Sequence, residues 1–347
     1  MAPWRCGMLA AGLVLAAWGA AAAPPVPPAL SEPAVVTPKA LGAATLAVTR
    51  AGARLVAVGE RGTVLLSDDA GATWRQARVP VQASLTAVRF VNERTGWAAG
   101  HLGVILRSDD GGEHWVKQLD GVRAAELVAQ AASADGDERA QKEAKRFVEE
   151  GPDKPFFDLD FVDAQRGLAV GAYNLAFTTT DGGRHWLPLR LPNPRSLHLY
   201  GVRFAGASVF VAGEQGLLLK SADGGASFAT LATPYKGSFF GLLAARSGTL
   251  IAYGLRGNAF RSADQGTSWD KLDTGLPVSI SAAVELDGGA LALLGQTGDL
   301  LLSRDDGRSF TRRAAPGGPV PAAGLTSAAD GQVVLASLRG MRSQPAP

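Results

Sequence analysis

The sequence predicts an all-β protein, a seven-bladed β-propeller with four-stranded blades and a small helical insertion. An eight-residue motif occurs six times, first as SDDAGATW (67–74) and SDDGGEHW (108–115). Alternating apolar segments separated by a glycine turn precede the copies, as in LVAVGERGTVLLS (55–67). The 347 residues include 43 glycines and 46% hydrophobic residues, which is typical of a folded protein with many tight turns.

The spacing of the motif gives the size of the repeat. The motif aspartates are Asp69, Asp110, Asp181, Asp223, Asp264 and Asp305. They follow one another at 41 or 42 residues, except for one interval of 71. A unit of about 42 residues with four short strands is the size of one propeller blade. The interval of 71 therefore contains an insertion between the second and third blades.

The motif itself predicts a structural turn. An aspartate can accept backbone N–H groups of its own turn, and glycine tolerates the positive φ that such a turn requires. The final Trp or Phe would cover the turn and pack into the blade. We therefore expect the six aspartates to be structural. The pattern S-x-D-x-G-x-x-W/F resembles the Asp box, or bacterial neuraminidase repeat, which occurs in enzymes and in scaffolds.

Six boxes predict six blades, and the C-terminal residues predict a seventh. GQVVLASLRG (331–340) keeps the strand pattern and the turn glycine but is not followed by a box. We expect the propeller to cover residues 42–343. Within the linker 23–41, the segment PAVVTPKAL (33–41) is expected to supply the missing outer strand, which would join the chain ends and cover sheet edges. Six complete blades with a frayed tail is the alternative.

The insertion, about residues 121–152, has a helical pattern. Residues 123–132 and 137–151 are rich in helix formers, Asp135 and Glu138 suggest a capping box, and Gly151 precedes a proline. Ala140, Ala144, Phe147 and Val148 form one apolar stripe. This stripe either packs on the propeller or docks a partner.

The N-terminus reads as a secretory signal, residues 1–22. Arg5 precedes an apolar run (8–23) that ends in small residues, with cleavage expected near Ala22 and a periplasmic mature chain. An uncleaved membrane anchor is the alternative. The single cysteine, Cys6, lies inside this segment, so the mature chain contains no disulfide.

Charge argues against a nucleic-acid binder. The chain has 34 basic and 32 acidic residues, and Arg5 leaves with the signal. A nucleic-acid-binding protein would show a concentrated basic excess. We therefore expect no nucleic acid among its partners.

The best candidates for binding lie in the turns between the second and third strands of the blades and in the loops that join consecutive blades. Both groups should share one face, with the Asp boxes on the other. The candidate residues on the first face are Arg61, His101, Tyr173, Arg195, His198, Tyr200, Tyr235, Lys236, Phe240, Arg256 and Arg339. Aromatic residues mixed with arginine are favoured at protein-recognition surfaces.

An enzymatic function has weaker support in the sequence. Asp158 and Asp160 in FFDLDF (156–161) are the best candidates for a pair of glycosidase carboxylates, but strand residues at these positions can equally bond backbone groups. The four histidines lack metal-ligand spacing, and no phosphate-binding loop is present. We expect no catalytic residue, no metal and no cofactor. A sialidase-like glycoside hydrolase or a carbohydrate-binding propeller is the alternative.

The repeat units also resemble a known family. AVGERGTVLLSDDAGATW (57–74) and AVGAYNLAFTTTDGGRHW (169–186) look like the photosystem II stability/assembly factor family, although the insertion is not part of its basic repeat. The resemblance implies a non-enzymatic propeller that holds membrane-protein subunits during assembly. It also implies that an arginine-bearing face contacts the partner, and Arg61, Arg256 and Arg339 occupy equivalent turn positions here. We therefore expect a monomeric scaffold or accessory factor for a membrane protein complex at the periplasmic face of the inner membrane.

Overall fold

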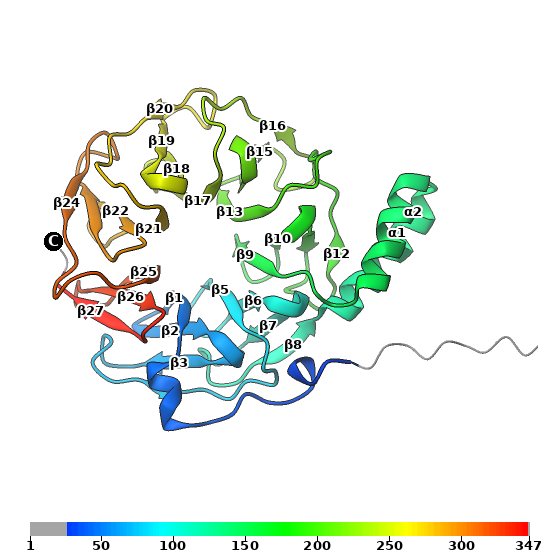
Figure 1. Cartoon of the computed structure of the whole chain (residues 1–347), viewed down its shortest axis with the longest axis horizontal. Coiled ribbons are helices and arrows are strands. Elements are labelled where there is room, and N and C mark those ends of the chain that lie inside the picture. Colours follow the sequence, from blue (N-terminus) through cyan, green and yellow to red (C-terminus); the bar gives the residue numbers. More distant parts are fainter. Residues whose placement is uncertain (1–25, 346–347) are drawn as a thin grey trace, which may run out of the picture.

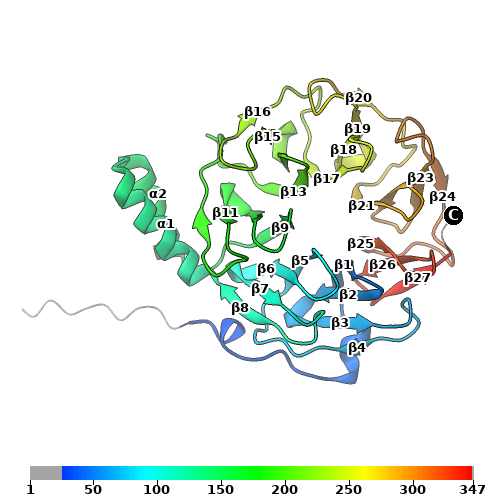
Figure 2. The same ribbon diagram turned by 180° about the vertical axis from the view of Figure 1, so that it is seen from behind.

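The computed structural model describes residues 26–345 and forms a ring of seven antiparallel sheets (Figure 1; Figure 2). The prediction of a seven-bladed propeller is confirmed. Each sheet is continuous in the sequence, and its strands are hydrogen-bonded in chain order from the centre of the ring outward. The predicted signal, residues 1–22, lies outside the described residues.

The bounds of the strands follow the repeat. The innermost strands are β1 (Thr45–Ala51), β5 (Leu85–Phe90), β9 (Phe156–Phe161), β13 (Leu199–Ala205), β17 (Phe239–Ala244), β21 (Ile280–Glu285) and β25 (Ala322–Ser327). The second strands are β2 (Arg54–Gly59), β6 (Gly96–Gly100), β10 (Gly167–Gly171), β14 (Ser208–Gly213), β18 (Leu250–Gly254), β22 (Leu291–Gly295) and β26 (Val333–Ser337). The third strands are β3 (Val64–Ser67), β7 (Ile105–Ser108), β11 (Ala176–Thr179), β15 (Leu218–Ser221), β19 (Ala259–Ser262), β23 (Leu300–Ser303) and β27 (Arg342–Gln344). The outer strands are β4 (Arg75–Gln76), β8 (Val116–Leu119), β12 (Leu187–Pro188), β16 (Ala229–Thr230), β20 (Asp270–Lys271) and β24 (Thr311–Arg313).

The hydrophobic core lies between neighbouring blades. Five of the second strands are buried along their whole length, and in β2 and β14 only the first residue is partly exposed, because adjacent blades cover both faces of these strands. One cluster combines Val56 and Leu66 of blade 1 with Leu85, Leu106 and Trp115 of blade 2. Each blade therefore needs its neighbours to bury its apolar side chains.

Six Asp boxes clasp the blades at the turn after the third strand, and they share one geometry. The box Ser or Thr hydroxyl donates to the aspartate Oδ1 at 2.7–3.0 Å. The same Oδ1 accepts the backbone N–H of box position seven at 2.9–3.0 Å. The fourth and fifth box residues have positive φ, for example Gly111 and Gly112 at 74° and 90°. The aspartates thus order the turn from within.

Cationic side chains between the blades form a second set of hydrogen bonds, which the motif did not predict. The residue before the box Ser or Thr is Arg107, Lys220 or Arg261 in three blades, and it donates to the backbone carbonyl of box position four in the next blade. These bonds are Arg107 to Gly182 at 2.9 Å, Lys220 to Gln265 at 2.8 Å and Arg261 to Asp306 at 2.8 Å. They connect consecutive boxes around the ring.

The expected ring-closing strand is not formed. Residues 33–37 have no regular structure, Pro38–Gly42 is a 3-10 helix, and the seventh sheet has three strands, all from C-terminal residues. The segment instead follows the outer edge of blade 1, where Gln76 bonds the backbone of Val35 and Thr37 at 3.0 and 2.9 Å. Pro33 and Pro38 have no N–H, which weakens this segment as a strand.

The ring closes through side chains. Thr45 of blade 1 donates from its hydroxyl to the carbonyl of Ser337 in blade 7, and accepts the N–H of the same residue, at 3.1 and 3.0 Å. Ala40, which precedes blade 1, is buried with Val334 and Ala336 of blade 7. The joint between the first and last blades is therefore a packed interface rather than a shared sheet.

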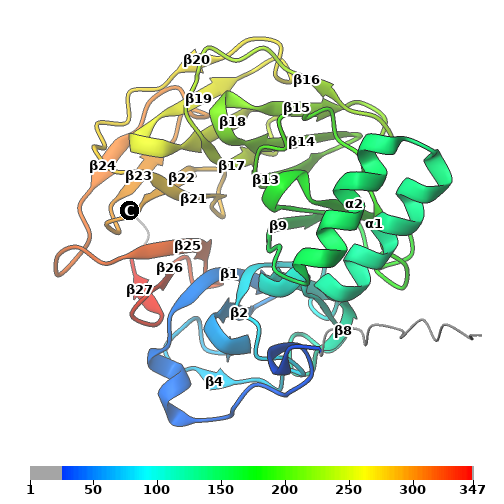
Figure 3. The ribbon, with the colours of Figure 1, turned by 45° about the vertical axis from the view of Figure 1, so that its right-hand side comes forward.

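The insertion forms a helical hairpin at the rim of the ring, α1 (Gly121–Asp135) and α2 (Glu138–Glu150) (Figure 3). The N-cap of α2 is Asp137, whose carboxylate accepts the N–H groups of Arg139 and Ala140, and not the expected Asp135. Ala144 and Phe147 of the predicted stripe are buried, whereas Val148 is exposed. Packing therefore accounts for most of the stripe.

Candidate partner-binding face

The turn after each second strand defines one face of the ring, which we call the turn face. Antiparallel order places this turn and the Asp box at opposite ends of the third strand, so the boxes form the other face, the box face. In five blades the turn is a short 3-10 segment: Glu60–Gly62, His101–Gly103, Ala172–Asn174, Glu214–Gly216 and Leu255–Gly257. A Cβ on Gly62 would lie 2.0 Å from the carbonyl oxygen of Val81, in the loop to blade 2. The turn and that loop are therefore neighbours, as expected.

The middle residue of the turn has left-handed backbone geometry. Its φ is 53° at Arg61, 52° at Tyr173 and 55° at Arg256, and all three side chains are exposed. Such a conformation is uncommon for residues other than glycine and is held by the surrounding hydrogen bonds. The fold thus presents these side chains in fixed positions on the turn face.

Five of the expected residues are exposed cationic or imidazole side chains: Arg61, His101, Lys236, Arg256 and Arg339. Within residues 26–345 their side chains form no hydrogen bond or ion pair. Arg195 is also exposed and donates to the Gln215 side-chain oxygen at 2.6 Å, which leaves its charge uncompensated. Elsewhere on the ring, Arg54 and Arg75 are paired with Asp68 and Glu113.

The acidic residues of the turns bind the backbone instead. Glu60 accepts the N–H of Ala44 at 3.1 Å, and Glu214 accepts the N–H of His198 at 2.8 Å. The two carboxylates therefore fix the start of an inner strand and do not pair with the exposed arginines. The uncompensated charge of the turns is positive.

Four of the expected aromatic residues form one cluster with a residue that the sequence did not single out. The ring centroids of Tyr173 and His198 are 4.5 Å apart, those of His198 and Tyr200 are 6.0 Å apart, and those of Tyr200 and Phe240 are 5.6 Å apart. Phe157 lies 5.3 Å from Tyr200 and 6.0 Å from His198. Phe157 is the second residue of the inner strand β9. This aromatic cluster spans blades 3, 4 and 5.

Tyr235 belongs to the interior rather than to this cluster. Its ring packs against Phe239 and Phe260, and its hydroxyl donates to the carbonyl of Leu255 at 3.2 Å. Burial raises the pKa of the Tyr235 phenol. The loop 233–241 therefore contributes Lys236 and Phe240 to the exposed surface, whereas Tyr235 holds the loop in place.

Tyr200 lies beside Glu214. Burial, followed by the negative charge of Glu214 and a hydrogen bond to it, raises the pKa of the Tyr200 phenol. A raised pKa opposes formation of the phenolate that a tyrosine nucleophile needs. The contact of Tyr200 with Glu214 therefore orders the aromatic cluster and does not prepare a nucleophile.

Asp158 and Asp160 are engaged in the packing of inner strands. Asp158 accepts the N–H of Val202 at 3.0 Å and pairs with Arg203 at 2.5 Å, and Asp160 accepts the N–H of Phe204 at 2.8 Å. Both carboxylates therefore join blade 3 to blade 4. They do not form an open acid and base pair.

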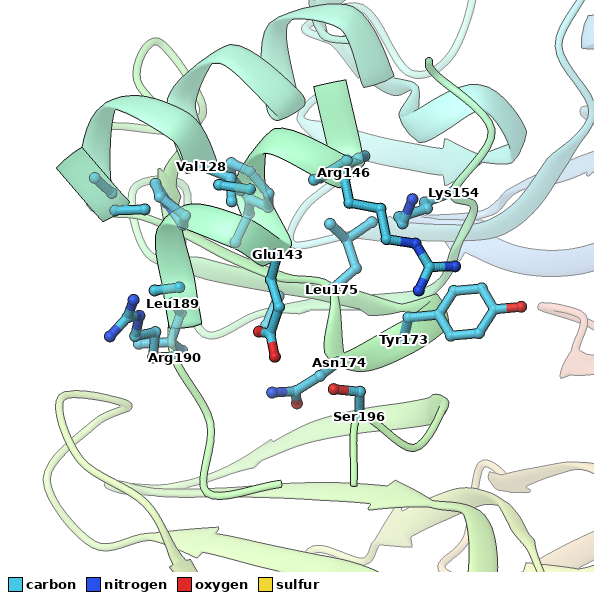
Figure 4. A pocket seen from close by; sticks show the side chains of 18 of the residues that line it. Val128, Glu143, Arg146, Lys154, Tyr173, Asn174, Leu175, Leu189, Arg190 and Ser196 are labelled. Atoms are coloured by element: carbon cyan, nitrogen blue, oxygen red, sulfur yellow. The ribbon is translucent and has the colours of Figure 1, made fainter. Parts of the chain in front are cut away.

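A groove of about 670 Å³ separates the helical hairpin from blade 3. Its walls include Val128, Phe147 and Leu189, and its end on the turn face includes Tyr173 and Ser196 (Figure 4). The ammonium of Lys154 lies 4.4 Å from the centroid of the Phe147 ring and 2.6 Å from the Glu150 carboxylate. At the tip, Arg190 pairs with Asp135 at 2.7 Å and holds the hairpin against the blade.

Residues 26–345 contain neither a candidate metal site nor a candidate membrane-spanning helix. No group of three or more His, Cys, Asp or Glu side chains could hold a metal ion there. In the same part of the chain, no helix has the length and apolar character that a membrane crossing requires.

Comparison with known proteins gives matches to one family. The family model described as "Photosynthesis system II assembly factor YCF48" matches residues 137–272. The photosystem II assembly lipoprotein Ycf48 of Synechococcus sp. (strain CC9902) is 37% identical over 76 residues, which are 21% of this chain and 23% of that protein. The match therefore spans about a quarter of the length of this relative.

Solved structures share the fold over most of the chain. A structure of YCF48 bound to a D1 peptide has a TM-score of 0.65 at 15% identity and covers 91% of this chain and 96% of that chain. A streptogramin B lyase has a TM-score of 0.67 at 11% identity and covers 87% and 93%. At this identity the likeness shows the fold alone, which a peptide-bound protein and an enzyme have in common.

The ring and its boxes define the class of protein, a seven-bladed Asp-box β-propeller. Within this class, parts of the chain are similar to photosystem II assembly factors, as the family model and the curated relative show. Both names describe assembly factors.

Proposed function

We propose that the protein is an exported scaffold or assembly factor that holds a membrane protein, or a complex of membrane proteins, at the periplasmic face of the inner membrane. The turn face is the binding surface, and the protein acts as a monomer. The curated relative is a lipoprotein, which supports export, and a structural neighbour is bound to a D1 peptide, which supports a membrane protein segment as the ligand.

The observation that carries this proposal is the combination of unpaired cations and partly exposed aromatic rings on one face. Arg61, Arg195, Lys236, Arg256 and Arg339 have no carboxylate partner, and they share the turn face with the aromatic cluster of Tyr173, His198, Tyr200, Phe240 and Phe157. Unpaired charge steers and selects a partner of opposite charge, and aromatic rings supply contact area at low entropy cost. We infer that the bound segment carries acidic residues next to apolar ones.

The test is capture of the partner from cells by the tagged, full-length protein. A variant with Arg61, Arg256 and Arg339 changed to glutamate should lose most of the captured membrane protein, because three attractive contacts become repulsive. Its melting temperature should not change, since these side chains bond nothing in the fold. A matched variant with glutamate at Arg94, Arg184 and Arg308, near the box face, should capture as the unmodified protein does. Equal loss in both variants would contradict the proposed face.

A further inference from the structure

His198 connects two neighbouring turns of the turn face. Its ring Nδ1 accepts the N–H of Tyr173, the middle residue of the blade 3 turn, at 2.9 Å. Its backbone carbonyl accepts the N–H of Glu214, in the blade 4 turn, at 3.1 Å. Its own N–H donates to the Glu214 carboxylate at 2.8 Å. The residue thus holds Tyr173 in the left-handed conformation that places its ring on the aromatic cluster.

The repeat offers an internal comparison for this contact. In blade 1 the middle residue of the turn, Arg61, donates its N–H to the Ser84 hydroxyl at 3.2 Å. In blade 5 Arg256 donates in the same way to the Ser279 hydroxyl at 3.2 Å. Ser84, His198 and Ser279 each stand directly before an inner strand. The residue directly before the inner strand therefore supplies the acceptor in all three contacts. Of these three acceptors, only the one between blades 3 and 4 is titratable.

The difference matters because of what protonation does to an imidazole. A neutral ring that accepts at Nδ1 carries its hydrogen on Nε2, whereas a charged ring carries a hydrogen on both nitrogens and accepts nothing. A serine hydroxyl remains an acceptor throughout the same pH range. Histidine is the side chain whose charge changes between pH 5 and 8.

We propose that the bond from the Tyr173 N–H to His198 Nδ1 is a pH-sensitive latch on the partner-binding face. Protonation of His198 directs an N–H group at the N–H of Tyr173, so the bond breaks, the turn 172–174 loosens, and Tyr173 leaves its ordered position on the aromatic cluster. Partner binding then weakens in acid. This regulation rests on the proposed function of the turn face.

The surroundings of the ring allow this change. Tyr173, Phe157 and Tyr200 are the aromatic neighbours, and the Tyr200 hydroxyl is held by Glu214. Glu214 is the charged group of the next turn, and its carboxylate accepts the backbone N–H of His198. Arg195, on the loop that carries His198, is directed to Gln215. Tyr173 is exposed on its outer side, at the end of the groove, so its turn has room to move.

The latch is tested first without a partner, by NMR of the mature chain between pH 8 and pH 5. At pH 8 the His198 ring should be neutral with its hydrogen on Nε2, and the Tyr173 amide should exchange slowly. At pH 5 the ring should be charged and the protection factor of the Tyr173 amide, its exchange rate relative to that of an unstructured amide at the same pH, should fall about tenfold, as expected for the loss of one hydrogen bond. A ring that stays neutral, or an amide that is unchanged when the ring becomes charged, would overturn the proposal.

His198→Ser is the matched variant, because it places the acceptor of blades 1 and 5 in blade 4. Its Tyr173 amide should be protected at both pH values, whereas His198→Phe, which has no acceptor, should leave that amide unprotected at both. In the capture assay, the unmodified protein should lose several-fold more partner between pH 7.5 and 5.5 than His198→Ser does. Equal pH dependence in these two proteins would overturn the regulation. Absence of capture at both pH values would instead contradict the proposed function, since the NMR titration decides the latch by itself.

Discussion

The aspartate of each box uses both carboxylate oxygens within its own turn. In Asp110, Oδ1 accepts the Ser108 hydroxyl at 2.9 Å and the His114 N–H at 3.0 Å, and Oδ2 lies 2.8 Å from His114 Nδ1. The sequence could predict this arrangement because every contact lies within five residues of the aspartate. It could not predict His198 as an acceptor, because Tyr173 is 25 residues away and belongs to another blade.

Asp110→Ala should lower the free energy of unfolding by about 1–3 kcal/mol, because it leaves a hydroxyl and two N–H groups without their acceptor. Urea denaturation measures the change. The neighbouring carboxylate provides the control: Asp109 is exposed and contacts Arg107, so Asp109→Ala should cost less than about 1 kcal/mol. Equal costs for the two variants would show that the box does not act as a clasp.

Some of the contacts that hold the blades together can be predicted from the sequence, and others cannot. The strand and turn pattern predicted all seven sheets, because alternation within a blade is local. The sequence did not predict the cations between the blades. Lys220 and Arg261 look like polar strand residues, and their partners, Gln265 and Asp306, lie 45 residues away. The segment 33–41 was misassigned because its apolar alternation resembles a strand, although two prolines and the side chain of Gln76 fix it along blade 1.

Lys220→Met tests the seam between blades 4 and 5. The substitution keeps the length of the side chain beside the Phe210 ring but removes the donor to the Gln265 carbonyl. We expect unfolding to become easier by about 1–2 kcal/mol, since bonds from charged donors are stronger than neutral ones. Lys271 is an exposed lysine of β20, and Lys271→Met should change little. An unchanged free energy of unfolding in Lys220→Met would mean that packing alone holds blades 4 and 5 together.

The complete ring should lose stability in acid through its boxes. The hydroxyls of Thr73 and Ser268 lower the pKa of Asp69 and Asp264 to about 2, from an ordinary value near 3.8. In Asp181 burial acts in the opposite direction, but the bonds from His185 still bring the pKa to about 2. The pKa values of Asp110, Asp223 and Asp305 are lowered as well.

A carboxyl whose pKa is lower in the folded state stabilises the fold at pH values above its unfolded pKa, and this stabilisation is lost as the pH falls through the folded value. The melting temperature should therefore be nearly constant from pH 7 to 5 and should fall steeply between pH 4 and 2. Calorimetry at intervals across this range measures it. Asp69→Asn, which removes one titrating box, should show a shallower fall, and a flat profile down to pH 2 would contradict the role of the boxes.

The two faces of the ring differ in whether their charged side chains have bonding partners. On the box face, the box aspartates accept bonds from hydroxyls and backbone N–H groups, and the cations between the blades donate to backbone carbonyls. On the turn face, the carboxylates of Glu60 and Glu214 bind the backbone, while the arginines that share this face with the aromatic cluster have no carboxylate partner. The sequence predicted that Arg61, Tyr173 and Arg256 lie in the turns, because the repeat fixes the positions of the turns. It could not predict which of them meet, since the cluster combines three blades.

The most direct measurement of the proposed role is capture with a photo-reactive amino acid placed on one face at a time. Lys236 on the turn face and Ala226 in the fourth box are both exposed, so either position can accept the probe. Crosslinking in cells followed by mass spectrometry should give a specific membrane protein from position 236 and none from position 226. The same membrane protein from both positions, or from position 226 alone, would contradict the assignment of the turn face as the binding surface.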